Sequence, residues 1–124
     1  MNFLIKEYSQ ENLEFLLIVI EYHTFAYPYY QKRGYFSGPE GASTEDIALI
    51  LKSLKGKCIR IAETFIFNNA PKELNISDVQ RKVVMNYLDK DDYNPAIWKN
   101  IFFSISVVLA QDKLNKFFAE SRNK

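Results

Sequence analysis

The stretch that decides the fold is Glu7-Tyr8-Ser9-Gln10-Glu11-Asn12-Leu13-Glu14-Phe15, which leads directly into Leu16-Leu17-Ile18-Val19-Ile20. Ser9 is a typical helix N-cap residue, and Glu11 suits the positive end of a helix dipole. Residues 13–20 are apolar almost all round, so we predict a helix over about residues 10–25, buried on most sides in a bundle. A cap needs only one polar side chain. The other polar residues are therefore either solvated neighbours of the cap or part of a partner-binding surface.

The segments on either side of this helix also have helical patterns. Residues 3–7 are typical of the end of a short helix. Ser43 and Ser77 each begin a helix with a hydroxyl cap followed by an acidic or amide residue three positions later. We expect Gly56 to end the first of these helices, with a helical period resuming beyond it as far as Asn68. The helix after Ser77 has an apolar side made of Val79, Val83, Val84, Tyr87 and Leu88.

The last part of the chain predicts a helix near residues 95–109 with Pro95 as its first residue. Trp98 lies at a core position of this helix. We expect a short break at residues 110–112 and then a final segment with an apolar face formed by Leu114, Phe117 and Phe118. Because no stretch alternates between apolar and polar residues as a half-buried strand does, the predicted class is all-α.

A loop rich in tyrosine, residues 27–41, separates the first helix from the second. It is longer than most connections between helices, so it is either functional or folded onto the body of the domain. Its aromatic rings lie near Lys32 and Arg33, a combination that could stack on single-stranded nucleic acid. A net charge of +1 gives no general attraction to nucleic acid, so packing against the domain is the favoured interpretation.

Length and composition indicate one domain, residues 1–124. A chain of this length with 48% hydrophobic residues can bury one core and is short for two. The single cysteine, Cys58, excludes an intrachain disulfide and favours a reducing compartment. The longest apolar run falls well short of the roughly 20 residues that span a bilayer. We therefore expect a soluble, cytoplasmic protein, with the surface of the plasma membrane as an alternative location.

The sequence contains no recognisable catalytic set. His23 and Cys58 form no pair with metal-ligand spacing, and no glycine-rich phosphate loop is present. Asp89 and Asp91 match the first and third positions of a calcium loop, but Asn94 replaces the required glycine and Asn100 replaces the bidentate glutamate. We expect no metal site, no cofactor and no enzymatic activity of the chain itself. An interaction domain is the favoured class.

Four cations occur close together around Gly56: Lys52, Lys55, Lys57 and Arg60. Each cation near an anionic lipid surface contributes about 1 kcal/mol to binding, so these residues could form a lipid-binding patch. A solvated helix face is the favoured interpretation.

Several motifs, taken in order, resemble those of the regulator of G-protein signalling (RGS) domain. They are Phe3-Leu4-x-x-Glu7-Tyr8-Ser9-x-Glu11-Asn12-Leu13-x-Phe15, Glu21-Tyr22, Ala70-Pro71-x-Glu73-Leu74-Asn75-Ile76, and Asp112-x-x-x-x-Phe117-x-x-x-Ser121. The resemblance covers nearly the whole chain apart from residues 26–57. That segment is similar to an expansion between the fourth and fifth helices of the family and includes an extra amphipathic helix from Ser43 to Lys55.

The resemblance implies an RGS-like antiparallel four-helix bundle with terminal helices, and a GTPase-activating protein for heterotrimeric G-protein α subunits (Gα). Members of the family grip the switch regions of Gα and favour its hydrolysis transition state, while the α subunit performs the chemistry. The implied contacts come from three loops. The first supplies Tyr8, Ser9, Glu11 and Asn12, the second supplies Glu73 and Asn75, and the third supplies Val108, Leu109, Asp112, Lys113 and Lys116. Because alternate loops of an up-and-down bundle lie at the same end, these loops should converge, with the Tyr-rich loop at the opposite end.

The chain departs from the family pattern in four ways. Leu16 replaces a common tryptophan, and Leu114 with Asn115 replace a more polar or aromatic pattern before the terminal Phe. Lys116 stands where the family usually has arginine, so a planar fork of donors is lost. The chain also begins where the third helix of the family would, so its first two helices are expected to be missing. Their absence should expose apolar surface that residues 26–57, a second copy of the chain or a parent protein could cover. The alternative function is an RGS-like scaffold or membrane-associated adaptor that does not stimulate GTP hydrolysis.

Overall fold

The computed structural model describes the backbone of residues 2–32 and 35–122 and the side chains of residues 10–32 and 35–111. Within these ranges every regular element is helical, which confirms the predicted all-α class. The main helices are α1 (Asn2–Ala26), α2 (Thr44–Ile61), α3 (Asp78–Asp89) and α4 (Lys99–Arg122). Short helical turns lie at Tyr27–Tyr29, Ala62–Ile66 and Pro95–Trp98. None of the helices in the described backbone is both long and apolar enough to cross a lipid bilayer.

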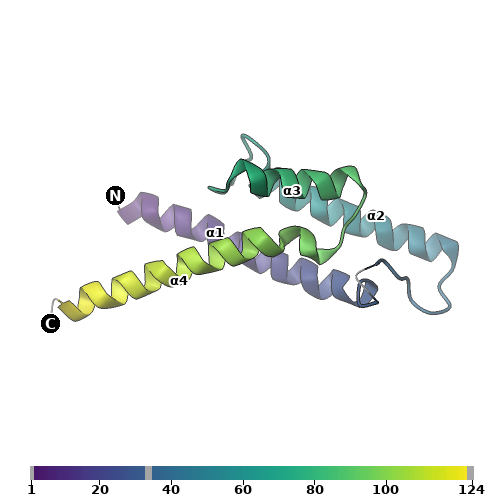
Figure 1. Ribbon diagram of the computed structural model, residues 1–124, viewed down its shortest axis with the longest axis horizontal. Helices are drawn as coiled ribbons and strands as arrows, with labels where there is room; N and C mark the ends of the chain where they lie inside the picture. Colours follow the sequence, from purple (N-terminus) through teal and green to yellow (C-terminus); the bar gives the residue numbers. More distant parts are fainter. Residues whose placement is uncertain (1, 33–34, 123–124) are drawn as a thin grey trace.

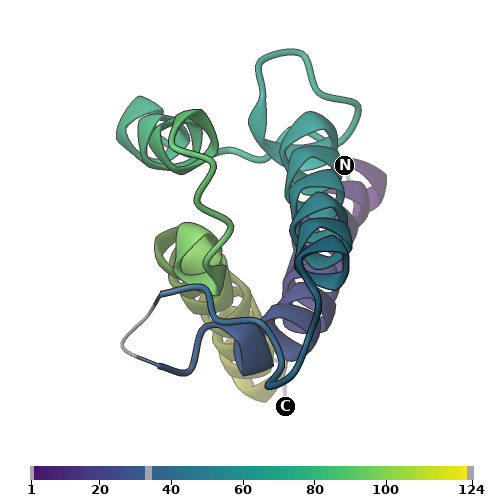
Figure 2. The same ribbon diagram turned by 90° about the vertical axis from the view of Figure 1, so that its right-hand side faces the viewer.

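The four main helices run in alternating directions along the chain (Figure 1). Seen nearly along the helices, α1 and α2 lie beside each other on one side of the molecule, and α3 and α4 lie on the other (Figure 2). The segment between α2 and α3 lies at the end of the molecule opposite the Tyr-rich loop (Figure 1). This arrangement agrees with the alternation of loop positions expected for an up-and-down bundle.

The core is centred on Phe15 of α1. Its ring meets Phe65 and Trp98 edge to face, with centroid distances of 5.5 Å and 6.2 Å. Such aromatic pairs add about 0.5–1.5 kcal/mol beyond the area they bury. Trp98 is fully buried, as its spacing predicted. The core residues of α1 follow the helical repeat and comprise Phe15, Val19, Tyr22 and Ala26.

The helix caps formed by serine are confirmed at both predicted positions. Ser43 and Ser77 each accept a hydrogen bond from the backbone N–H three residues later. The side chains of Asp46 and Gln80 in turn accept a hydrogen bond from the backbone N–H of the cap serine. These are complete capping boxes, in which each partner satisfies an otherwise unpaired backbone donor. The apolar side predicted for α3 is wrong at one position, because Val79 is 71% exposed.

Helix α1 differs from its prediction in length and in burial. It begins at Asn2, so residues 3–7 and the expected start at Ser9 belong to one continuous helix. The segment contains neither glycine nor proline to interrupt it, and a serine inside a helix lowers stability only slightly. Leu13, Leu17 and Ile20 are 51–57% exposed, which contradicts the expectation of burial on most sides.

Two predicted interruptions are also absent. Gly56 lies inside α2, so the expected extra helix from Ser43 to Lys55 and the helical segment beyond it form one helix. A glycine in a helix interior costs about 1 kcal/mol, but Leu54 and Cys58 on either side of it are fully buried and hold the helix in place. The expected break at residues 110–112 lies within the continuous helix α4.

The Tyr-rich loop folds back on the domain, as favoured from its sequence. The backbone N–H of Ser37 donates to the carbonyl of Tyr29 at 2.7 Å. The ring of Phe36 stacks on Tyr29 and meets Tyr30 edge to face, with centroid distances of 6.1 Å and 5.8 Å. Tyr30 is buried in the core of the domain, and Tyr29 and Phe36 pack against that core, so these aromatic side chains hold the loop on the domain.

Candidate protein-interaction surface

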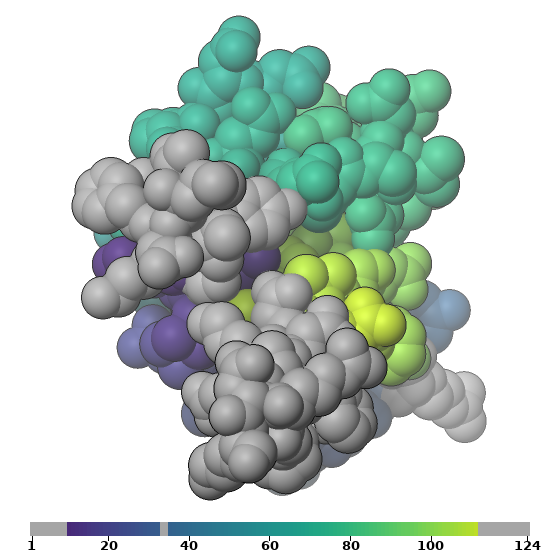
Figure 3. All heavy atoms as spheres, turned by 90° about the vertical axis from the view of Figure 1, so that its left-hand side faces the viewer, coloured from purple at the N-terminus to yellow at the C-terminus, as the bar shows by residue number. Residues whose placement is uncertain are grey.

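The connector between α2 and α3, residues 67–77, is the centre of the candidate surface. Lys72 Nζ pairs with Glu14 Oε2 of α1 at 2.5 Å, and this contact lowers the pKa of the Glu14 carboxyl. At the start of α3, Gln80 Nε2 donates to Ser104 Oγ of α4 at 3.0 Å. These two contacts link the connector and the start of α3 to α1 and α4. Figure 3 shows this end of the molecule, with the teal residues of the connector and α3 beside the yellow-green residues of α4.

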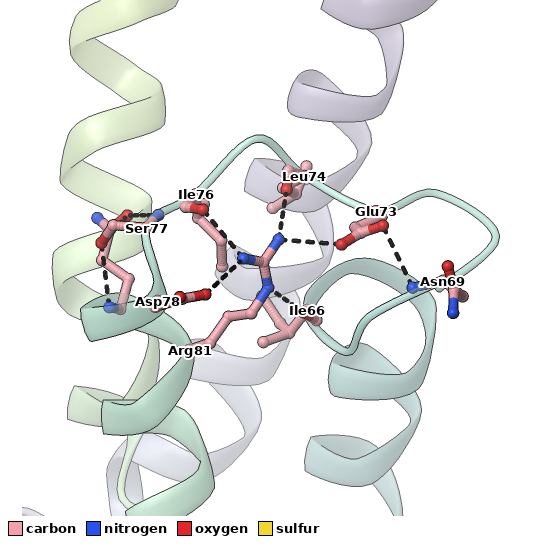
Figure 4. Close-up of polar contacts among 9 residues, drawn as sticks. Ile66, Asn69, Glu73, Leu74, Ile76, Ser77, Asp78 and Arg81 are labelled. Atoms are coloured by element: carbon pink, nitrogen blue, oxygen red, sulfur yellow. Dashed lines mark hydrogen bonds and ion pairs between the residues drawn. The ribbon is translucent and has the colours of Figure 1, made fainter.

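The connector has a defined conformation because Arg81 of α3 is bonded to several parts of it (Figure 4). The Arg81 guanidinium donates to the backbone carbonyls of Ile66, Leu74 and Ile76. It also pairs with the carboxylate of Glu73 at 3.0 Å. The Leu74 backbone N–H donates to the carbonyl of Phe65, and the Leu74 side chain is buried. The connector is thus fixed to both α2 and α3.

Asn75 is exposed between two anchored residues. Leu74 is buried on one side of it and Ile76 is partly buried on the other. An exposed polar side chain on a fixed backbone suits recognition of a partner, because little conformational entropy is lost when it binds. Asn75 is therefore well placed to contact a partner.

Glu73, the other residue predicted from the second loop, has a structural partner on each carboxylate oxygen. Oε1 accepts from the backbone N–H of Asn69 at 3.2 Å, and Oε2 pairs with Arg81. Asn69 has a φ of 66°, a left-handed conformation that asparagine adopts more readily than most residues. Glu73 therefore stabilises the turn at the end of α2.

The first predicted contact segment is helical and only partly accessible. Tyr8 and Ser9 lie on α1, and their side chains are outside the described set. Glu11 is partly exposed, whereas Asn12 is only 4% exposed, so the structure leaves almost none of the Asn12 side chain accessible to a partner. Asn12 shares the inward side of α1 with Phe15 and Val19, three and seven positions further along the chain.

The third predicted contact segment is part of α4 and forms no loop. Val108 is exposed, whereas Leu109 is partly buried and packs against the core. The side chains of Asp112, Lys113 and Lys116 lie outside the described residues. Of the two predicted contacts on this segment whose side chains are described, Val108 is the more exposed.

The four cations of the predicted lipid patch are exposed on α2 but do not form one flat face. Lys52 and Lys57 are five positions apart, which places them about 140° apart around the helix axis. The Lys57 ammonium lies 4.8 Å from the centre of the Phe25 ring in α1, a cation–π contact that the sequence did not indicate. Lys57 and Arg60 border an open groove of about 620 Å³ between α1 and α2, with Ile18, Tyr22 and Ile61 among its lining residues.

Tyr22, Cys58 and Tyr30 form a buried polar cluster next to this groove, which the sequence analysis did not predict. The Tyr22 hydroxyl donates to the backbone carbonyl of Tyr93, and Cys58 is fully buried beside Tyr22. Burial raises the pKa of the Cys58 thiol from its ordinary value of 9.0 to about 12, and that of Tyr30 from 10.0 to about 12. The Cys58 thiol is therefore neutral near pH 7 and a poor nucleophile.

This cluster predicts a loss of stability in alkaline solution. Because the pKa of Cys58 is raised in the folded state, the unfolded chain releases this proton at lower pH than the folded chain. The stabilisation is complete below about pH 9 and is lost as the pH rises toward 12. We expect urea unfolding to give a free energy lower by about 1.4 kcal/mol at pH 10 than at pH 8, the equivalent of one pKa unit. Equal free energies at the two pH values would contradict the burial of these groups, and Cys58→Ala should show a weaker pH dependence.

No group of three or more His, Cys, Asp or Glu side chains suited to a metal ion is found among the described residues. Comparison of the chain with protein-family models, curated proteins and solved structures finds no match.

Proposed function

We propose that this domain is a GTPase-activating protein for a heterotrimeric Gα subunit, which it binds through the end of the bundle that carries the connector. The observation that carries the proposal is the exposed position of Asn75 on a fixed backbone. The RGS-like motif Ala70-Pro71-x-Glu73-Leu74-Asn75-Ile76 implies that this asparagine reaches the catalytic glutamine of Gα.

The proposed mechanism requires no reacting group on the domain. The Gα subunit contains the residues and the nucleotide that react, and the domain binds the transition-state conformation of its switch regions more tightly than the ground state. Binding energy that is larger in the transition state than in the ground state increases the rate of hydrolysis. A partner surface with a fixed conformation is sufficient for this role.

The contact surface that we propose among the described side chains is smaller than the one the resemblance implies. Asn75 is its centre, and the accessible residues that the other two segments contribute are Glu11 of α1 and Val108 of α4. Asn12 is buried, and Glu73 is engaged within the connector. The resemblance alone supports the remaining contacts of the proposal, which are Tyr8, Ser9, Asp112, Lys113 and Lys116.

The helical state of the first and third segments favours a second candidate function. In a non-activating scaffold, the domain would bind a protein without distinguishing the transition state of hydrolysis. The outward apolar residues of α1, namely Leu13, Leu17 and Ile20, would suit such a role because exposed apolar patches often mark interaction sites.

Nucleotide-dependent capture separates the two functions. The immobilised domain is offered Gα subunits with GDP, with GDP and aluminium fluoride, and with a non-hydrolysable GTP analogue. A GTPase activator should retain the aluminium fluoride form at least about tenfold more tightly than the GDP form, a difference of about 1.4 kcal/mol. Equal retention of all three forms would support a scaffold that binds Gα, and no retention of any form would contradict the GTPase-activating role.

A further inference from the structure

We infer that Arg81 is the positioning residue of this surface, and that Glu73 acts with Arg81 to brace the connector instead of contacting the partner. Together they hold residues 67–77 in the conformation that exposes Asn75. The part of the inference that concerns binding rests on the proposed function, whereas the part that concerns the brace can be tested on the domain alone.

The hydrogen bonds of Arg81 span the whole connector. Nε donates to the Ile66 carbonyl at 3.0 Å, where the connector leaves the helical segment after α2. The two terminal nitrogens donate to the Ile76 carbonyl at 3.1 Å and the Leu74 carbonyl at 3.4 Å, next to the start of α3. A guanidinium group can do this because it presents five N–H donors in a planar fork.

The acidic partners of Arg81 differ in their exposure. Asp78 lies 3.5 Å from the guanidinium, but its side chain is 88% exposed, so this pair contributes little. The pair with Glu73 is shorter, at 3.0 Å, and its side chains are 19% and 34% exposed. Glu73 also accepts the Asn69 N–H, so its carboxylate connects Arg81 to the turn at the other end of the connector. Both oxygens of Glu73 are therefore engaged inside the connector, which gives this side chain a structural role there.

The position of these bonds explains their relevance to Asn75. Arg81 binds the carbonyls of the residue before Asn75 and of the residue after it. Without these bonds the connector would sample other conformations, and only a fraction of the molecules would present Asn75 correctly. Apparent affinity falls in proportion to that fraction, while the bound complex is unchanged.

The brace is tested by hydrogen exchange on the isolated domain. We compare Arg81→Lys, Glu73→Gln and the control Lys82→Gln, which changes an exposed cation next to Arg81. The probes are the amides of Lys72 and Leu74, which donate to Thr64 and Phe65. We expect exchange at both amides to be about tenfold faster in Arg81→Lys, somewhat faster in Glu73→Gln and unchanged in the control. Unchanged exchange in both test variants would overturn the inference. If Arg81→Lys does not fold, the exchange rates of the same two amides in Glu73→Gln test the inference alone.

The effect on binding is tested by stimulation of GTP hydrolysis at increasing domain concentration. A positioning role predicts that Arg81→Lys raises the half-maximal concentration about tenfold and leaves the maximal rate unchanged. A lower maximal rate with an unchanged half-maximal concentration would contradict this role. The double variant Arg81→Lys/Glu73→Gln should be little worse than Arg81→Lys, because residues that act as a unit are not additive. Fully additive effects would show that Glu73 contacts the partner and would overturn its assignment to the brace.

These two tests also separate the inference from the proposed function. If the unmodified domain stimulates no Gα subunit, the proposed function fails, but the exchange experiment still decides whether Arg81 and Glu73 hold the connector.

Discussion

Replacing Asn75 with alanine is expected to abolish the stimulation of GTP hydrolysis while the fold stays intact. The side chain is exposed, and the backbone around it is held by bonds that do not involve the asparagine amide. An exposed substitution of this kind changes stability by only about 0.5 kcal/mol. Loss of a contact made in the transition state should lower the maximal rate by about tenfold or more, which corresponds to about 1.4 kcal/mol.

The measurement is the maximal rate of hydrolysis at saturating domain concentration, with circular dichroism and thermal unfolding as tests of the fold. Asn68→Ala is the matched control, because it makes the same change at an exposed position of the same connector. We expect the control to stimulate hydrolysis as well as the unmodified domain does. A folded Asn75→Ala variant with undiminished stimulation would refute the role assigned to this residue.

Replacing Trp98 with alanine is expected to have the largest effect on stability. Trp98 is fully buried and packs edge to face on Phe15, so its removal leaves a large cavity at the centre of the core. Truncation of a buried tryptophan typically costs about 3–5 kcal/mol. Since folded domains are stable by only about 5–15 kcal/mol, this variant should be close to unfolding.

Urea unfolding followed by far-ultraviolet circular dichroism measures this loss, because the variant no longer contains tryptophan as a fluorescent probe. Phe103→Ala is the control. It removes another large aromatic ring from the same part of the chain, but that ring is 69% exposed, so we expect a change of about 0.5 kcal/mol or less. A loss below about 1 kcal/mol for Trp98→Ala would mean that Trp98 does not lie in the core.

The features predicted correctly from the sequence are those determined by residues close together in the chain. The capping boxes at Ser43 and Ser77 each need only a serine and a side chain three positions later. The burial of Trp98 follows from the helical spacing of the apolar residues after it. Local rules were sufficient here because the cap contacts fall within about one turn of a helix, and because the buried side of a helix follows from the spacing of its own apolar residues.

The errors concern features that depend on distant parts of the chain. Leu13, Leu17 and Ile20 are as apolar as the core side of α1, and only the positions of the other helices decide which side is covered. Gly56 was predicted to end a helix because glycine has a low helix propensity. The burial of Leu54 and Cys58 on either side of it keeps this part of α2 helical. Tertiary packing of this kind outweighs local helix propensity.

The candidate site was predictable only in part. The resemblance to RGS motifs drew attention to Asn75, and a connector between helices is usually accessible. Arg81 gave no such signal, because its partners are mainly backbone carbonyls up to 15 positions away in the sequence. The role of Glu73 was hidden for the same reason, and the burial of Asn12 depends on the helices that surround α1.

Single-turnover GTP hydrolysis by a panel of Gα subunits, with and without this domain, tests the proposed function most directly. We predict faster hydrolysis by at least one subunit, with the stimulation lost in Asn75→Ala and retained in Asn68→Ala. Unchanged hydrolysis by every subunit of a panel from the source organism would contradict the proposal that this domain activates a Gα GTPase.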